Sequence, residues 1–404
     1  MLHRLQFPRI SRPRGLRASR GPFYNGGMPE TCNPAPMMQR VAPGGGEEPP
    51  QPGDVPDPTR SGLWERYSRQ ILFAPLGVSG QRALRTSHVA LVGCGALGST
   101  QAGLLARAGV GRLTLIDRDY VEASNLQRQS LFEETDALEA LPKAVAAARR
   151  LHAINSEVEV RPQVADLTPE NVHALLGDAS VILDGTDNFE TRYLLNDFSV
   201  AEGRPWIYGA VVGAQGVTFT VLPGESACLE CIFAAQPDGV TENCDTAGVL
   251  NWAVQYVAAV QVAECVKLLV GARTALRRTL LSADLWRNDF RQLQPPPRDP
   301  DCRVCQQRDF QHLRGERRPH ITLCGRDSVQ IHEHDRVVDF AQLGPRLAAH
   351  GRVRHNAHVL KFWLDEPGGG AGLELTLFPD GRAMIKGTTD PAVARSLYAR
   401  FIGS

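Results

Sequence analysis

The stretch SHVALVGCGALGSTQAGLLARAG, residues 87–109, decides the fold class of this 404-residue chain. Its first part is a short apolar run that predicts a buried strand, and its second part predicts a helix that begins with small residues. Gly93, Gly95 and Gly98 lie at the junction, where glycine lets the backbone approach a phosphate and the helix N-terminus supplies N–H donors. The turn alone also fits close packing of a strand against a helix. The residues around it must therefore distinguish a phosphate-binding turn from a packing turn.

The segments that follow alternate between apolar strands and helices. Strands are predicted at 112–117, 157–165 and 181–188, with helices at 143–154 and about 169–176. This alternation predicts an α/β fold with a doubly wound, mostly parallel, Rossmann-like sheet. Residues 205–223 alternate in polarity and contain glycines, which predicts later, antiparallel strands.

The ends of the chain differ from this middle part in composition. Residues 1–60 are predicted to be a disordered tail, because 41–58 consist mostly of Pro, Gly and acidic residues. We expect no secretory leader, since the first 29 residues lack an apolar core segment. Residues 61–308 are predicted to form the α/β domain. Residues 309–404 are predicted to be a polar linker followed by a small α+β domain.

Composition bounds the function. Lys plus Arg equals Asp plus Glu at 44 each, so no overall field favours nucleic acid or an anionic membrane as a partner. The apolar run 247–271 could suggest a membrane span. Polar residues interrupt it and predict a buried core helix instead: Asn251, Gln255, Gln261, Glu264 and Lys267.

An acidic residue and a set of cations extend the glycine turn into a nucleotide site. Asp117 ends the second strand, where an acid accepts hydrogen bonds from ribose hydroxyls. The glycine turn and this acid suit NAD and ATP alike. ATP is favoured by the polar and cationic side chains that follow, because a triphosphate must be neutralised before a nucleophile reaches it. These are Asn125, Arg128 and Gln129 in the next loop and Lys143 at a helix start. Solvated surface charge is the alternative for Arg128 taken alone.

Asp187 ends a later strand in DGTDN (184–188), at the edge where open α/β sheets bind ligands. A carboxylate beside phosphates suits Mg²⁺, which takes oxygen ligands and shares them with the nucleotide. Capping of the following helix is the alternative role for Asp187.

Two pairs of cysteines have the same Cys-x-x-Cys spacing, CLEC at 228–231 and CRVC at 302–305. Without a leader, a reduced compartment is expected, where such pairs indicate metal ligands rather than disulfides. Four thiolates can enclose one structural Zn²⁺ tetrahedrally: Cys228, Cys231, Cys302 and Cys305. A redox pair or two unrelated buried pairs are the alternatives. Cys32, Cys94, Cys265 and Cys324 are expected to have no ligand role.

Taken in order, the motifs resemble the ThiF/MoeB family, whose members adenylate sulfur-carrier proteins. They are RYSRQ (66–70), GCGALG (93–98), DRDYVEASNLQRQ (117–129), PK (142–143), DGTDN, CLEC, CDTAG (244–248) and CRVC. The resemblance covers about 62–308, which it identifies as an adenylating ATP-binding domain with a zinc site. The C-terminal part, beginning LCGRDSVQI (323–331), is similar to the tail of thiamine-pathway ThiF proteins.

The resemblance implies roles for individual residues. Gly95 corresponds to the nucleotide-loop glycine, Asp117 to the ribose ligand, and Asp187, with Asn188 beside it, to the Mg²⁺ ligand. Asn125, Arg128 and Lys143 correspond to the phosphate and transition-state contacts. Arg69 corresponds to an arginine that reaches the ATP of the neighbouring subunit, which implies a homodimer. Cys244 corresponds to a cysteine on a loop near the end of the carrier.

The expected activity is ATP-dependent adenylation of the C-terminal glycine carboxylate of a ubiquitin-like carrier of the ThiS/MoaD type ending in Gly-Gly. A sulfur donor, either a cysteine desulfurase or a sulfurtransferase, would then give a thiocarboxylate for thiamine or molybdopterin biosynthesis in the cytoplasm. Two alternatives remain: an NAD-dependent oxidoreductase, and an inactive relative that only binds a ubiquitin-like partner.

Overall fold

The structure is a computed structural model that describes residues 64–233, 247–316, 323–324, 328–331, 337–364 and 372–403. The tail predicted at 1–60, and Cys244, lie outside these residues. Residues 66–404 form one compact unit that contains two sheets.

The larger sheet has the strand order β3-β2-β1-β4-β5-β6-β7-β8. Its strands are β1 (His88–Val92), β2 (Arg112–Ile116), β3 (Glu159–Gln163), β4 (Val181–Asp184), β5 (Trp206–Val212), β6 (Gln215–Val221), β7 (Leu280–Asp284) and β8 (Asp289–Leu293). The first five in this order pair in parallel, and β6, β7 and β8 continue antiparallel from β5. The doubly wound sheet with later antiparallel strands is therefore confirmed, and the order reverses between β1 and β4.

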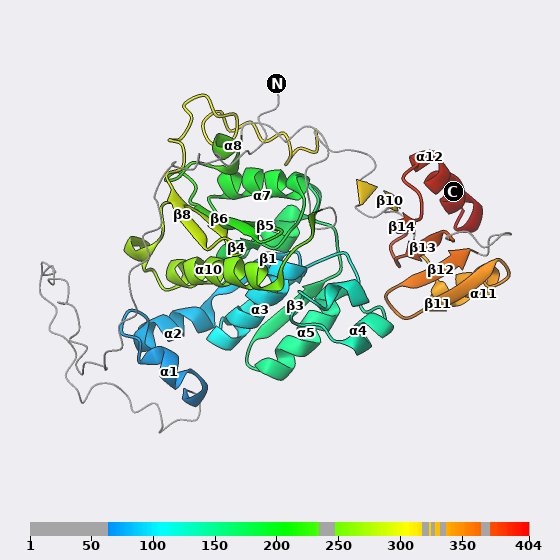
Figure 1. The fold of residues 1–404 in the computed structure, drawn as a ribbon, viewed down its shortest axis with the longest axis horizontal. Helices are drawn as coiled ribbons and strands as arrows, with labels where there is room; N and C mark the ends of the chain where they lie inside the picture. Colours follow the sequence, from blue (N-terminus) through cyan, green and yellow to red (C-terminus); the bar gives the residue numbers. More distant parts are fainter. Residues whose placement is uncertain are drawn as a thin grey trace, which may run out of the picture. The chain divides into compact units, whose positions relative to one another are not determined.

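Helices cover both faces of this sheet (Figure 1). They are α1 (Ser68–Ile71), α2 (Gly77–Thr86), α3 (Ala96–Ala108), α4 (Glu134–Leu138), α5 (Lys143–Ile154), α6 (Val172–Leu176), α7 (Phe189–Glu202), α8 (Leu229–Ile232) and α10 (Asn251–Leu269). One apolar core joins α3, α5 and α10 to one face, and a second joins α6 and α7 to the other. Strand β1 is buried along its whole length because it contributes to both cores.

Helix α10 is long and apolar enough to cross a membrane, the one such helix in the part of the chain that the structure describes. It packs against α3, β5 and β6, and it buries the polar side chains Gln261 and Glu264 inside the fold. Gln261 donates from Nε2 to the carbonyls of Asp184 and Ile207, both at 3.0 Å. These contacts make α10 a core helix, as its interrupted apolar pattern predicted.

The second sheet is antiparallel, in the order β11-β12-β13-β14-β10-β9. Its elements are β9 (Leu323–Cys324), β10 (Ser328–Ile331), α11 (Phe340–Leu347), β11 (Gly351–His355), β12 (Leu360–Leu364), β13 (Glu374–Leu377), β14 (Ala383–Lys386) and α12 (Pro391–Phe401). Both helices pack on it through a core of their own. Helix α12 begins as predicted: Asp390 accepts the Ala392 N–H at 2.8 Å and Pro391 fills the first helical position.

The segment 309–316, predicted as a linker, is bound to the larger domain. The His312 N–H donates to Asp197 Oδ2 at 2.9 Å, and the imidazole stacks on the Tyr193 ring at 5.2 Å. Its polar composition resembles an exposed tether, but burial of Asp197 on α7 requires donors that this segment supplies.

Candidate active site and metal centre

The glycine turn lies at the carboxyl end of β1, where the strand order reverses. Gly93 has φ +89°, and a Cβ added to Gly98 would lie 1.8 Å from the Gly93 carbonyl oxygen. These two glycines are therefore required for the tight turn and for packing of α3. A Cβ on Gly95 would meet only the Gln129 amide, at 3.9 Å. The backbone at Gly95, the N-cap residue of α3, is thus open to a ligand, and its role as the nucleotide-loop glycine stays a prediction.

Asp117 connects the second strand to this turn. Its Oδ2 accepts the Cys94 N–H at 2.6 Å, and its Oδ1 accepts the Asp119 N–H at 2.7 Å. Burial raises the pKa of Asp117 to about 6, although the nearby Lys143 ammonium opposes the rise. The carboxylate is thus held beside the glycine turn, where an acceptor for ribose hydroxyls was expected.

Lys143 enters the same site from the start of α5. Its side chain is buried, and its Nζ lies 2.9 Å from Asp119 Oδ2. Burial would lower the pKa of Lys143, but the carboxylates of Asp119, Asp117 and Asp187 raise it above its ordinary value. Burial would likewise raise the pKa of Asp119, but Lys143 and Arg118 hold it below its usual range. The structure therefore places one buried predicted cation, Lys143, near the carboxylates of two predicted site residues, Asp117 and Asp187, and near that of Asp119.

Asp119 is a site residue that sequence reasoning missed. It follows Asp117 by two positions, so it could be taken for an ordinary loop acid. In the structure it is the carboxylate that holds Lys143, and only the pairing between two distant elements shows this.

Asn125 and Gln129, from the predicted phosphate loop, are both buried near the turn. Asn125 Oδ1 accepts the Glu122 N–H at 3.1 Å, which closes a short turn at the 3-10 helix η2 (Ala123–Asn125). Gln129 faces Gly95, and its buried Oε1 has no hydrogen-bond partner among the described residues. A buried, unpartnered acceptor beside an open glycine fits a site for a polar ligand.

Arg128 lies in the same loop but is bound locally. Its Nη1 donates to the Ser124 carbonyl at 2.9 Å, and the side chain is half-buried. Its proposed approach to phosphate is thus not seen in this conformation and stays a prediction.

Asp187 follows β4, next to the glycine turn across the sheet. Asn188, and not Asp187, caps α7: its side chain accepts the Thr191 N–H at 2.9 Å. The capping role considered for Asp187 is therefore excluded, and its exposed carboxylate remains available to a ligand.

A buried ion pair between Asp184 and Arg192 stabilises the carboxyl end of β4. Asp184 is fully buried and accepts from Arg192 Nε at 3.0 Å, and Arg192 also donates to the carbonyls of Thr186 and Gly209. Burial lowers the pKa of Arg192, but the Asp184 carboxylate raises it above its ordinary value. Arg192 thereby fixes the residue that precedes Asp187. Sequence reasoning missed this pair because its two members look like ordinary strand-end and helix charges.

Two predicted residues are not brought into the site. Arg69 is exposed on α1, and its expected role belongs to a neighbouring subunit. Cys244 lies outside the described residues.

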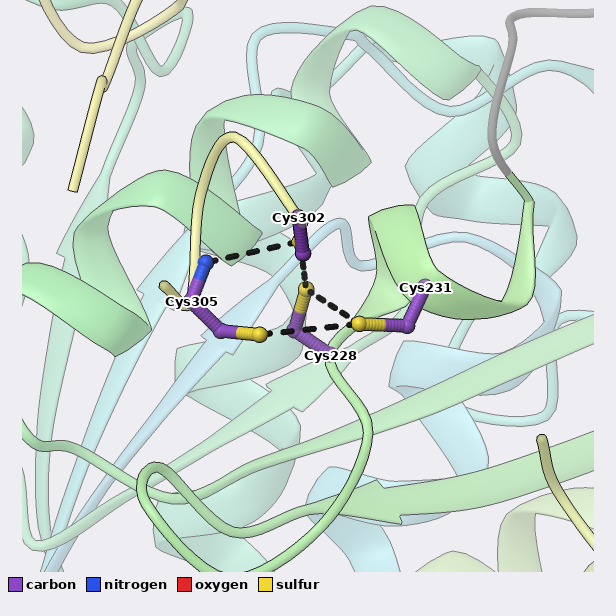
Figure 2. A group of neighbouring side chains, drawn as sticks. All are labelled: Cys228, Cys231, Cys302 and Cys305. Atoms are coloured by element: carbon purple, nitrogen blue, oxygen red, sulfur yellow. Dashed lines mark hydrogen bonds between the residues drawn. The ribbon is translucent and has the colours of Figure 1, made fainter. Parts of the chain in front are cut away.

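The four cysteines of the two pairs converge on one point (Figure 2). The Sγ–Sγ distances are 3.8 Å from Cys228 to Cys231, 3.6 Å from Cys228 to Cys302, and 3.5 Å from Cys231 to Cys305. A disulfide needs about 2.05 Å. A zinc tetrahedron with Zn–S bonds of about 2.3 Å has sulfurs about 3.8 Å apart. The spacing therefore fits four ligands of one ion.

The chemistry of the cluster also fits a cation. A hydrogen bond between the thiols of Cys228 and Cys231 lowers the pKa of Cys231 to about 5 and raises the pKa of Cys228. At least one sulfur of the cluster is therefore readily ionised to a thiolate, the form that binds a cation. Arg303 and Glu230 tie the two cysteine turns together through bonds of 3.0 and 2.6 Å. Cys94 and Cys265 are buried outside the cluster, as expected.

Comparison with known proteins places this site in a family. The sequence model described as "ThiF family" matches residues 67–304. The sulfur carrier protein ThiS adenylyltransferase of Bacillus subtilis is 45% identical over 342 residues, which are 84% of this chain and 99% of that protein. The SAMP-activating enzyme E1 of Haloferax volcanii is 39% identical, over 60% of this chain and 88% of its own length.

The fold matches solved structures as well. A crystal structure of E. coli MccB with MccA-N7isoASN has a TM-score of 0.53 at 26% identity, covering 59% of this chain and 74% of that one. MccB with ATP has a TM-score of 0.52 at 24% identity, over 62% and 76%, and shows the shared fold.

Proposed function

Since the chain belongs to the ThiF family, we propose that it is an adenylyltransferase that activates a ubiquitin-like sulfur carrier protein with ATP. The substrate would be the carrier's C-terminal glycine carboxylate, and the products an acyl-adenylate and pyrophosphate. The relatives at 45% and 39% identity bear names of enzymes with this kind of activity, which supports the proposal.

One observation carries the proposal: a buried lysine and three carboxylates meet beside an open glycine turn. Lys143 lies with Asp119, and the charges of Asp117 and Asp187 act on it. A redox site for nicotinamide has no need for a buried ammonium here. A triphosphate does, because negative charge develops on its oxygens as pyrophosphate leaves.

The chemistry follows from these groups. The carrier carboxylate is ionised at neutral pH, so its oxygen attacks the α-phosphorus without a general base. The bond from the α-phosphorus to the bridging oxygen breaks, and pyrophosphate leaves. Lys143, Arg128 and Arg69 of the partner subunit would neutralise charge, and Asp117, with Asn125 and Gln129, would orient the nucleotide. A persulfide sulfur on the donor then attacks the acyl carbon and displaces AMP, and a thiol reduces the resulting acyl disulfide to release the thiocarboxylate.

Two metal ions fit the residues present. Asp187 would hold Mg²⁺, since its carboxylate is exposed beside the nucleotide edge and hard ions take oxygen ligands. The four cysteines would hold Zn²⁺ with no open position, so that ion would stabilise the fold without taking part in the reaction.

The carrier is proposed to be of the ThiS type, in thiamine biosynthesis. The match to the Bacillus subtilis enzyme extends over 84% of this chain, well beyond the 60% matched by the archaeal enzyme, and so includes C-terminal residues. We further propose a homodimer, a cytoplasmic location, a role for Cys244 near the carrier's end, and division of the chain into a tail (1–60), an adenylating domain (61–308) and a C-terminal domain (309–404).

The test is carrier-dependent exchange of pyrophosphate into ATP. The purified chain is mixed with candidate carriers ending in Gly-Gly, and the mass of each carrier is measured by mass spectrometry to detect added AMP. Asp187→Ala should abolish exchange while the fold is unchanged. Glu157→Ala is the matched control, because Glu157 is an exposed carboxylate just before β3, at the opposite edge of the sheet.

Each alternative gives a different result. NADH binding without exchange would favour an oxidoreductase. Carrier binding without AMP transfer would favour an inactive relative. Full exchange by Asp187→Ala would remove Asp187 from the mechanism.

A further inference from the structure

The second sheet contacts the larger domain at one small apolar cluster. Tyr120 and Ala140 come from the segment between β2 and α5, and Val359, just before β12, and Phe378, just after β13, flank strands of the second sheet. All four are buried, with at most 8% of their surface exposed. This contact lies inside the compact unit of residues 66–404.

Polar contacts surround the cluster. Lys361 Nζ lies 3.8 Å from the centre of the Tyr120 ring, and Lys386 Nζ lies 3.2 Å from Glu122 Oε1. Asn356 Nδ2 donates to the Glu139 carbonyl at 2.8 Å. The second sheet therefore contacts residues at both ends of the segment 118–142.

Both ends of this segment adjoin the nucleotide site. Tyr120 and Pro142 form a β-bridge, and the Lys143 N–H donates to the Asp119 carbonyl at 2.8 Å. The contacts at Tyr120 are thus one residue from the Asp119–Lys143 pair. Glu122, which binds Lys386, also donates its N–H to Asn125.

Charge from the second sheet also reaches the site. Arg382 is buried in the turn between β13 and β14, and it is among the cations, after Lys143 and Arg118, that oppose burial in setting the pKa of Asp119. The carboxylate that holds Lys143 is therefore within the electrostatic range of the second sheet.

We propose that the second sheet holds segment 118–142 in the conformation that binds ATP, with Val359 and Lys386 as positioning residues. This rests on the proposed function, because it assumes that Asn125 and Lys143 contact the nucleotide. A loop that is correctly placed only part of the time lowers the apparent affinity for ATP in proportion to that fraction. Chemistry at saturating ATP is unchanged, since ATP selects the correctly placed loop.

The test compares the double variant Val359→Ala/Lys386→Met with the wild type. We expect the dissociation constant of ATP, measured by calorimetry without carrier, and the KM for ATP to rise about three- to tenfold. We expect kcat to stay within about twofold, and amide hydrogen exchange in 118–142 to become faster. Lys386→Arg should retain the wild-type KM, because it keeps the charge next to Glu122.

Val393→Ala/Arg395→Met is the matched control. It replaces a valine by alanine and a cation by methionine at exposed positions of α12, the helix that packs on the same sheet, and should leave the KM unchanged. A fall in kcat at constant KM, or an unchanged dissociation constant, would overturn the proposal. Failure of the wild type to bind ATP or to adenylate any carrier would instead refute the proposed function, so the two failures are distinguishable.

Discussion

Replacing Asp184 by asparagine should destabilise the fold strongly, although the two side chains have the same shape. Asp184 is fully buried and Arg192 nearly so, and their charges compensate one another at 3.0 Å. The asparagine Oδ1 could still accept from Thr186, whose N–H and hydroxyl now donate to the carboxylate at 2.9 and 2.7 Å. The amide group, however, would turn a donor toward Arg192.

The size of this loss of stability depends on which hydrogen-bond acceptors Arg192 retains in the variant. Breaking a buried ion pair by removing one partner costs about 3–5 kcal/mol. Arg192 would retain the carbonyls of Thr186 and Gly209, at 2.7 and 3.0 Å, and the ring of Tyr208 at 5.1 Å. These acceptors compensate part of the charge, so we expect the low end, about 3 kcal/mol.

Urea unfolding followed by fluorescence measures this loss as a lower midpoint with an unchanged slope. Asp284→Asn is the matched control: Asp284 also ends a strand and accepts neighbouring backbone N–H groups, but its partner Arg287 is largely exposed. That change should cost less than about 1 kcal/mol.

The double variant Asp184→Asn/Arg192→Met separates the pair from its surroundings. Because it leaves no uncompensated charge, it should be more stable than Asp184→Asn alone, with a coupling energy of about 2 kcal/mol. A loss below about 1 kcal/mol for Asp184→Asn, or additive effects in the double variant, would refute the claim that this pair supports the strand end.

Removal of the zinc proposed for the four-cysteine cluster should destabilise the protein. A chelator, or Cys302→Ser, should lower both the zinc content and the midpoint of thermal unfolding, and an unchanged midpoint in metal-free protein would contradict a structural role. The KM for ATP should rise as the pH falls below about 6, because Asp117, with a pKa of about 6 against an ordinary 3.8, then gains a proton and accepts poorly from ribose hydroxyls. At pH 5 the ionised fraction is about one tenth, so the KM should rise about tenfold. Since the pKa is raised on folding, acidification from pH 6 to 4 stabilises the fold through this group, and unfolding does not explain the rise. A KM that is flat between pH 7 and 5 would exclude Asp117 as a ribose acceptor.

Much of the fold, and the grouping of the four cysteines, followed from local patterns. The apolar run before Gly93, the small residues of α3 and the glycines themselves predict a strand, a turn and a helix whatever surrounds them. The equal spacing of the two cysteine pairs predicted the cluster, because each pair holds two sulfurs close together and two such pairs can supply four ligands to one ion. Asp117 and Asp187 were proposed as ligands because each follows a strand, and parallel strands end at one edge of the sheet.

Other features were decided by tertiary structure alone. The sequence could not show that Asn188 caps α7 and leaves Asp187 exposed, because both residues suit a helix start equally. Nor could it pair Lys143 with Asp119, or Tyr120 with Val359, whose positions in the chain are far apart. Local hydrogen bonding and periodicity depend on neighbours within a few residues, so a sequence determines them. Which charge compensates a buried charge depends on which distant elements the folded sheet and its helices bring within a few ångströms, and only the folded chain decides that.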